Sequence, residues 1–104
     1  MIYLKIHDTD NGAMVAICDE KLLGNIYKDK KTGMVLDLKK YADFYKGELV
    51  KPENLVDILK RIYIYSGNIV GNEAVSAVIK AGLATGAEVK RIQDVPSLHI
   101  YKIL

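Results

Sequence analysis

The alternation at the start of the chain constrains the fold most, because apolar residues at every second position interleave with Tyr3, Lys5 and His7. A period of two is typical of a β-strand with one buried face. The segment Asp10-Asn11-Gly12 follows directly, and Asn-Gly pairs tolerate positive φ at both central positions of a type I′ turn. The apolar run Ala13 to Cys18 then predicts the returning strand of a β-hairpin.

Short elements are expected between this hairpin and residue 47. They are a helical turn over 19–24, with Asp19 near its N-cap and Gly24 as a left-handed stop; strands at 25–28 and 34–38, joined by a turn at 30–33; and one or two helical turns over 39–45, ended by Gly47. These segments indicate a meander of about four short strands.

Two helices are predicted in the second half of the chain. Pro52 suits a first helical position, where a missing N–H costs nothing. Leu55, Ile58, Leu59 and Ile62 follow with helical spacing, which predicts a helix over 53–65. A second helix with a small apolar face is expected over 72–81, and residues 66–68 are interpreted as the turn between the helices. The tail predicts strands at 89–92 and 98–103, with Pro96 between them favouring an edge.

These patterns predict a single α+β domain over residues 1–104. We expect an antiparallel or mixed sheet of about four to six strands, with the two helices packed on one face. The chain has 104 residues, of which 50% are hydrophobic, so it can bury one core without disulfides or a structural metal.

Composition excludes several classes of protein. The 15 basic and 13 acidic residues leave a net charge of +2, without the strong positive field of a non-specific nucleic-acid binder. The lone Cys18 cannot form an intrachain disulfide, which favours a reducing compartment. The first ten residues lack the apolar stretch of a signal peptide, and the longest charge-free run, 62–72, is too short to span a membrane. We therefore expect a cytoplasmic protein with no membrane partner.

Cys18 and the two carboxylates after it invite comparison with a catalytic nucleophile. A reactive cysteine needs a cation or a helix N-terminus to lower its pKa, whereas Asp19 and Glu20 would disfavour the thiolate. A packed thiol is the favoured interpretation. A catalytic Cys18 would require His7 or His99 to fold beside it.

Two further motifs resemble ligand sites and are better explained by turns. Residues 8–12 open like a calcium loop, but Ala13 stands where that loop needs glycine and Asp19 where it needs glutamate. Gly67 and Gly71 precede a helix whose free N–H groups can bind an anion, yet Glu73 in its first turn would repel a phosphate. No metal and no cofactor are expected.

Lysines and tyrosines are mixed in the first half of the chain. Tyrosine rings stack on unpaired bases and lysines contact phosphates, so the mixture can bind single-stranded nucleic acid. Nearby aspartates dilute the charge, and a solvated face with tyrosines covering the core explains the same pattern. The candidate nucleic-acid-binding residues are Lys28, Lys30, Lys31, Lys39, Lys40, Tyr27, Tyr41 and Tyr45.

Three segments together carry a family resemblance: 16–24, 44–48 and 68–75, followed by the closing Val95-Pro96. In order and spacing they resemble an archaeal family of small uncharacterised proteins, catalogued as domain of unknown function four hundred and twenty-four. The resemblance implies a cytoplasmic protein with a role near RNA or translation. The family-motif residues are Cys18, Asp19, Glu20, Gly24, Tyr45, Gly47, Glu48, Asn68, Gly71, Glu73 and Pro96. Ser97 stands where the family often has a histidine, which argues against a catalytic or metal role there.

Three functional hypotheses follow. The first is a non-enzymatic binding module associated with RNA or the translation machinery. The second is a protein–protein adaptor that uses an acidic spot of Asp19, Glu20 and Glu48, or exposed tyrosines. The third is a small enzyme centred on Cys18 or on the glycine turn at 67–73. The sequence leaves the partner and the oligomeric state open.

Overall fold

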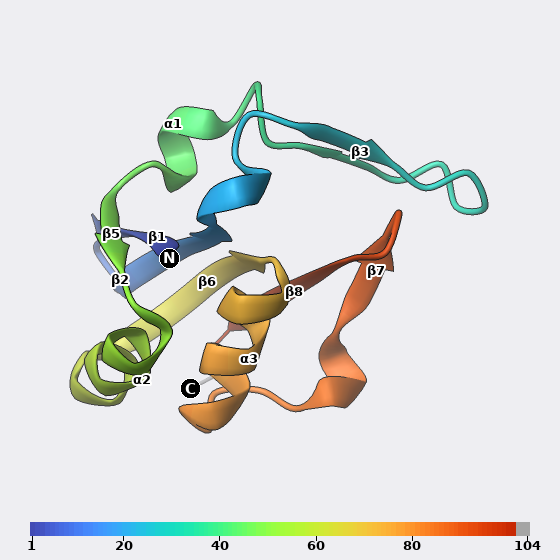
Figure 1. The fold of residues 1–104 in the computed structure, drawn as a ribbon. Helices are drawn as coiled ribbons and strands as arrows, with labels where there is room; N and C mark the ends of the chain where they lie inside the picture. The colour runs from blue at the N-terminus through green and yellow to red at the C-terminus, as the bar shows by residue number, and fades with distance from the viewer. Residues whose placement is uncertain (102–104) are drawn as a thin grey trace.

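A computed structural model describes residues 1–101 and places the elements in two sheets and three α-helices (Figure 1). The strands are β1 (Ile2–Thr9), β2 (Gly12–Asp19), β3 (Ile26–Lys28), β4 (Val35–Asp37), β5 (Glu48–Val50), β6 (Ile64–Val70), β7 (Lys90–Ile92) and β8 (Val95–Tyr101). The helices are α1 (Ala42–Tyr45), α2 (Pro52–Arg61) and α3 (Asn72–Lys80), with 3₁₀ turns η1 (Glu20–Leu22) and η2 (Gly86–Glu88). The predicted α+β fold class is confirmed.

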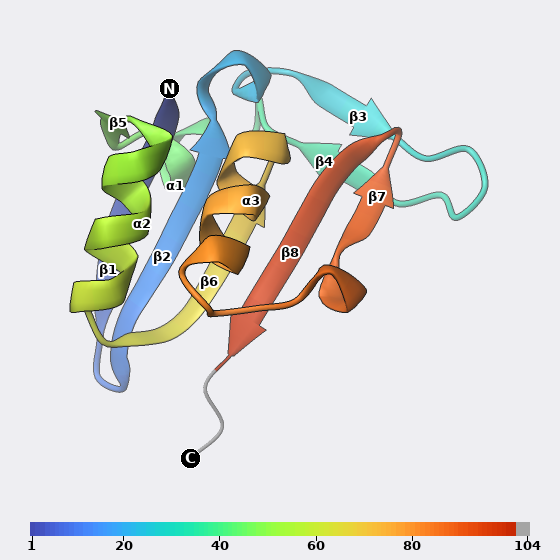
Figure 2. The same cartoon turned by 60° about the horizontal axis from the view of Figure 1, so that its bottom comes forward.

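The main sheet has six strands in the order β5-β1-β2-β6-β8-β7. The β1–β2 hairpin and the pairs β1–β5, β6–β8 and β7–β8 are antiparallel, whereas the central pair β2–β6 is parallel. A parallel pair needs a crossover connection, and α1, β5 and α2 supply it. Strands β3 and β4 form a separate two-stranded hairpin that extends as an arm beyond the sheet (Figures 1 and 2).

Helices α2 and α3 lie side by side on one face of the main sheet, as predicted (Figure 2). Leu55 and Leu59 of α2 and Val78 of α3 are buried against Ile17 and Ile69 of the central strands. The small residues of α3 let this helix approach the sheet closely. This packing forms the larger of two hydrophobic cores.

The opposite face of the sheet is covered at one end only. Here α1, η1 and the base of the β3–β4 arm pack on Ala16, Cys18, Val70 and Val95 and form a second, smaller core. Successive side chains of β2 point to opposite faces of the sheet, so alternate residues of this strand lie in the larger core and in the smaller core. The remaining part of this face has no helix over it among the described residues.

The largest error of the sequence-based prediction concerns residues 62–70. Helix α2 ends at Arg61, and the residues interpreted as the end of a helix and an interhelical turn form the central strand β6. Ile62 happens to complete the helical spacing, and Ser66-Gly67-Asn68 has the composition of a turn. Gly67 is needed for packing instead, because a Cβ there would lie 2.8 Å from a Val15 methyl group and 2.9 Å from Cγ1 of Ile100.

The hairpin turns also differ in detail from the prediction. Thr9 pairs with Gly12, so Asp10 and Asn11 form the first turn, and Asn11 does not adopt positive φ. The turn with positive φ at two successive residues joins β7 to β8, at Gln93 (51°) and Asp94 (64°). The strand predicted at 98–103 begins earlier in the structure, at Val95, and includes Pro96, while the last two residues of the prediction, 102–103, lie outside the described residues.

No helix within residues 1–101 is long and apolar enough to span a membrane.

Candidate nucleic-acid interface

Strand register arranges the side chains of the partly covered face in three rows across β1, β2, β6 and β8. The first row is Tyr3, Cys18, Val70 and Ser97; the second is Lys5, Ala16, Asn68 and His99; the third is His7, Met14, Ser66 and Tyr101. Directly paired residues on one face have Cβ atoms about 4.5–5.5 Å apart. The side chains of each row are therefore neighbours across the strands.

Exposure increases from the first row to the third. Cys18 and Val70 are buried as part of the second core and Ser97 is also buried. Met14, Ser66 and Asn68 are half-buried and His99 is exposed. Tyr101 is 72% exposed. We call the six residues Met14, Ser66, Asn68, His99, Tyr101 and Lys5 the open face. It contains no acidic side chain.

Helix α1 borders the open face and fixes one of its edges. The Phe44 ring stacks on the His7 ring with centroids 4.8 Å apart, and its carbonyl oxygen lies 3.0 Å from His7 Nε2. Nζ of Lys5 donates to the carbonyl oxygen of Asp43 at 2.6 Å. These contacts hold α1 against β1, so that the aromatic residues of α1 lie next to the open face.

A groove of about 360 Å³ lies between α1, strand β4 and the open face. Its walls are largely apolar and aromatic, and besides the two tyrosines its polar members are Asp37 and Asn68. The lining residues are Val35, Leu36, Asp37, Leu38, Tyr41, Phe44, Tyr45 and Asn68. We call it the Asn68 groove. Apolar walls with a few polar groups are typical of small-ligand pockets.

The predicted lysine–tyrosine residues separate into two places in the structure. Lys28, Lys30 and Lys31 lie on the β3–β4 arm and the turn at its end, whereas Lys39, Lys40 and Tyr41 lie just before α1, beside the Asn68 groove. Tyr41 is 54% exposed, and the Lys40 ammonium lies 5.5 Å from the centre of its ring.

Two of the predicted tyrosines are less accessible. Tyr27 is half-buried, and Tyr45 is buried in the second core. Burial, with a smaller contribution from Cys18, raises the pKa of Tyr45 to about 12. The expectation that Tyr45 presents a ring for base stacking therefore needs correction: its ring forms part of the groove wall and of the core.

Several family-motif residues meet at one structural joint where β2 and β6 end and α3 begins. The backbone N–H groups of Glu73 and Ala74 donate to the Asp19 carboxylate at 3.1 and 2.8 Å. Asp19 is 1% exposed, and its pKa is raised because the loss of hydration outweighs these two hydrogen bonds. Gly71 precedes the helix at φ 110°, and its N–H donates to the Pro96 carbonyl oxygen at 2.9 Å. Asp19 thus caps α3.

This joint corrects one expectation. Asp19 stands at the N-cap of η1, as predicted, but its side chain makes no cap hydrogen bond there. Its carboxylate is buried and caps α3, which begins 53 residues later in the sequence, so Asp19 does not join an acidic docking spot. Glu20 and Glu48 are exposed. Two N–H groups at the start of α3 that could bind an anion already donate to the Asp19 carboxylate, so they are not available to bind a phosphate at the glycine turn.

Cys18 lies in the first row, fully buried, with its Sγ donating to the Asp19 carbonyl oxygen at 3.4 Å. Burial, and next the charge of Asp19, raise the pKa of the thiol to about 12. Its row contains no histidine. This environment matches the interpretation of a packed thiol and is opposite to what a nucleophile requires.

The remaining glycines of the family motif are required by the conformation and close packing of the backbone. Gly24 has φ 92° after η1, as expected of a left-handed stop, and its N–H donates to the Leu38 carbonyl oxygen. Gly47 passes so close to β1 that a Cβ would overlap the Leu4 carbonyl oxygen and lie 2.8 Å from Lys5 Cβ.

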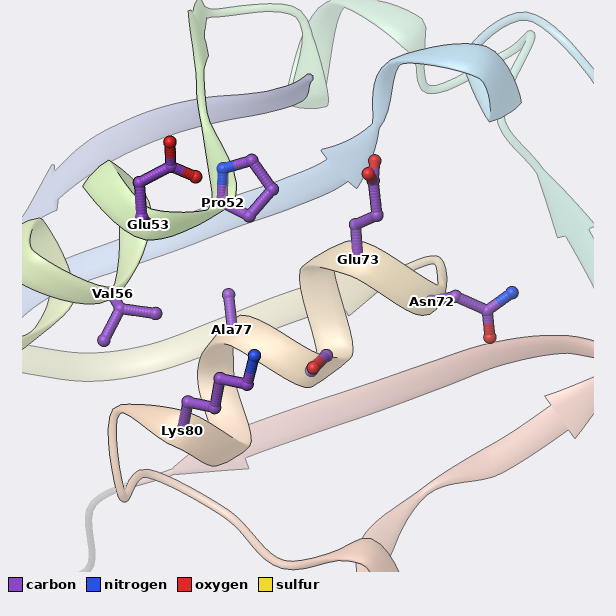
Figure 3. Close-up of a pocket in the computed structure, with 8 residues that line it drawn as sticks. Pro52, Glu53, Val56, Asn72, Glu73, Ala77 and Lys80 are labelled. Carbon is purple, nitrogen blue, oxygen red and sulfur yellow. The ribbon is translucent and has the colours of Figure 1, made fainter.

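The helix face carries a larger groove, about 590 Å³, between α2 and α3 (Figure 3). Val56 and Ala77 lie along its middle, Glu53 and Glu73 at the end where both helices begin, and Lys80 toward the other end. The amino group of Met1 lies 3.7 Å from the Glu73 carboxylate. Carboxylates at both helix N-termini make this groove unsuitable for a phosphate.

Sequence reasoning missed the ring side chains of the open face, His99 and Tyr101. The signal was present in the alternation Leu98-His99-Ile100-Tyr101, in which the aliphatic residues face the helices. Alternation shows that a strand has two faces, but not which face is left without a covering helix.

The six-stranded mixed sheet carries two helices on one face and is covered at one end only on the other, which defines a small α+β protein. Residues 6–103 match the family described as Protein of unknown function (DUF424), and the chain belongs to this family, as the resemblance indicated.

Among solved structures, the chain is similar to an uncharacterized conserved protein from Methanopyrus kandleri. The two share 27% identity and a TM-score of 0.79, and the match covers 99% of this chain and 95% of that one. Among curated proteins, no significant match to the chain is found.

Proposed function

We propose that this protein is a non-enzymatic binding module for single-stranded RNA and that the open face, with Tyr41 at its border, is the binding surface. The observation that carries the proposal is the row geometry, in which His99 and Tyr101 lie on the uncovered part of the sheet face opposite α2 and α3. Unpaired bases stack on ring side chains of this kind, and a sheet is a rigid platform for them.

The charges near the open face suit an RNA backbone. Lys5 lies in the second row, and Lys39 and Lys40 precede α1, while the three rows contain no carboxylate. Lys28, Lys30 and Lys31 extend the basic surface along the arm. With a net charge of only +2, we expect modest affinity that depends strongly on salt.

The test is a titration of fluorescent RNA octamers, single-stranded and in a duplex, followed by anisotropy at about 20 and 200 mM salt. We expect single strands to bind at low salt, to bind more weakly at high salt, and to lose most affinity in Tyr101→Ala. Ile79→Ala, on α3, is the matched control and should bind normally. Absence of binding at the lower salt concentration would contradict the proposal.

A link to the translation machinery stays a prediction from the family resemblance, and co-sedimentation with ribosomes tests it. The cytoplasmic location expected from the lone cysteine likewise stays a prediction and suits an RNA ligand.

The adaptor alternative has one observation in its favour, the groove between α2 and α3. Its apolar middle and the paired Glu53 and Glu73 suit a basic, amphipathic segment of another protein. Co-purification from a native lysate, compared with Glu53→Lys, tests this alternative. Recovery of the same proteins by both variants would contradict it.

A further inference from the structure

We infer that the Asn68 groove is a pocket for one unpaired nucleobase that carries an exocyclic amino group, so that the surface favours adenine or cytosine over uracil. The inference rests on the proposed function and adds a base preference to it. It is carried by two polar groups of the groove, Asn68 and Asp37, and by the nature of the walls around them.

The side-chain amide of Asn68 has no hydrogen-bond partner among residues 1–101, although the residue is half-buried in the centre of the sheet. Its cross-strand neighbours on this face are Ala16, which has no polar side chain, and His99. Among the described residues, no side-chain nitrogen or oxygen is both shielded from water and without a partner, so this amide is open to solvent and free to bind a ligand. A base edge, with a donor next to an acceptor, would satisfy both of its ends.

The second polar group is the carboxylate of Asp37. Its Oδ1 accepts the backbone N–H groups of Lys39 and Lys40 at 3.2 and 2.8 Å, which fixes the side chain. Its Oδ2 has no partner among the described residues. A carboxylate oxygen can only accept hydrogen bonds. It therefore attracts an amino group and repels the O4 carbonyl of uracil.

The walls and size of the groove fit a planar ring. Tyr41 and Phe44 line it with aromatic surface, Val35 and Leu36 with aliphatic surface, and its volume is about 360 Å³. An amino group has two protons, so one can be donated to Asn68 and the other to Asp37. Adenine and cytosine both place a ring nitrogen acceptor beside this amino group, where the amide N–H₂ of Asn68 can donate.

The test compares RNA octamers of A, C and U in the anisotropy assay at low salt. We expect A and C octamers to bind roughly 10- to 100-fold more tightly than the U octamer, the range for one bidentate pair. Replacing adenosine with purine riboside, which lacks only the amino group, should remove most of this preference. Asn68→Ala should also remove it, while the matched Asn54→Ala variant, which removes an exposed amide on α2, should retain it.

Asp37→Asn is the sharper variant, because it keeps an oxygen for the two backbone N–H groups and offers an N–H₂ group in place of Oδ2. We expect it to raise affinity for the U octamer relative to the A octamer. Circular dichroism verifies that each variant is folded. Equal binding of all octamers by wild type and Asn68→Ala would overturn the base pocket and leave the proposed function intact. Failure of every octamer to bind would overturn both.

Discussion

Gly71→Ala tests whether the joint between β2, β6 and α3 holds the fold together. A Cβ at this position would overlap Cγ of Asp19 and lie 2.5 Å from its Oδ2 and 2.7 Å from its Cβ. Asp19 cannot yield, because it is buried and its two carboxylate oxygens accept the N–H groups of Glu73 and Ala74. The substitution must therefore displace the carboxylate or the start of the helix.

Two contributions make up the stability cost of this substitution. Gly71 has φ 110° and ψ 158°, a region that is essentially restricted to glycine and costs other residues on the order of 1–3 kcal/mol. Each buried N–H that loses its partner costs about 1–3 kcal/mol more. We expect the free energy of unfolding to fall by about 3–5 kcal/mol, a large part of the 5–15 kcal/mol typical of a domain.

Urea unfolding followed by circular dichroism measures this change, with Gly24→Ala as the matched control. Gly24 also has positive φ, 92°, but a Cβ there would meet no atom within 4 Å, so its substitution should cost only about 1–2 kcal/mol. In an Asp19→Ala background, Gly71→Ala should cost at least about 1 kcal/mol less than in wild type. Equal costs for the two glycines, or strict additivity with Asp19→Ala, would refute the role assigned to the joint.

Three further outcomes are expected. Burial raises the pKa of Asp19 above its value in the unfolded chain, so between these two pKa values the native state binds more protons than the unfolded state, and stability should fall as pH rises through that window. Asp19→Asn should flatten this part of the profile of stability in urea against pH. An unchanged profile would count against a buried carboxylate at this position. Cys18, with a thiol pKa of about 12, should resist a thiol reagent at pH 8 in the native protein and react fully in urea, and fast native labelling would contradict its burial. Gly47→Ala should lower stability by about 2–4 kcal/mol, because the new methyl group would overlap the Leu4 carbonyl, and a wild-type melting temperature would show that β5 can shift.

The elements that the sequence predicted well are those with a local signal. The β1–β2 hairpin, α2 and α3 follow from alternation, helical spacing and Pro52 at the start of α2. The strand β6 was missed because its residues carry a turn-like composition that only their neighbours explain. Gly67 is small so that Val15 and Ile100 can pack beside it, and those partners are distant in the sequence.

The candidate site was predicted in part, for a related reason. Lys39, Lys40 and Tyr41 were identified from composition, and the structure places them beside the Asn68 groove. Asp19 was assigned to the surface because nothing in the neighbouring sequence explains why an acidic residue beside a turn would be buried. It is buried because its carboxylate caps α3, which begins far along the chain. His99 and Tyr101 became candidates for base stacking only when the structure showed which face lacks helices.

The most direct test of the central claim is a map of amide chemical shifts in the ¹⁵N-labelled protein during titration with a single-stranded A octamer at low salt. The account predicts that the largest changes fall on β6 and β8 around Asn68, His99 and Tyr101, and at Tyr41. Changes concentrated on α2 and α3, or no changes at saturating RNA, would contradict it.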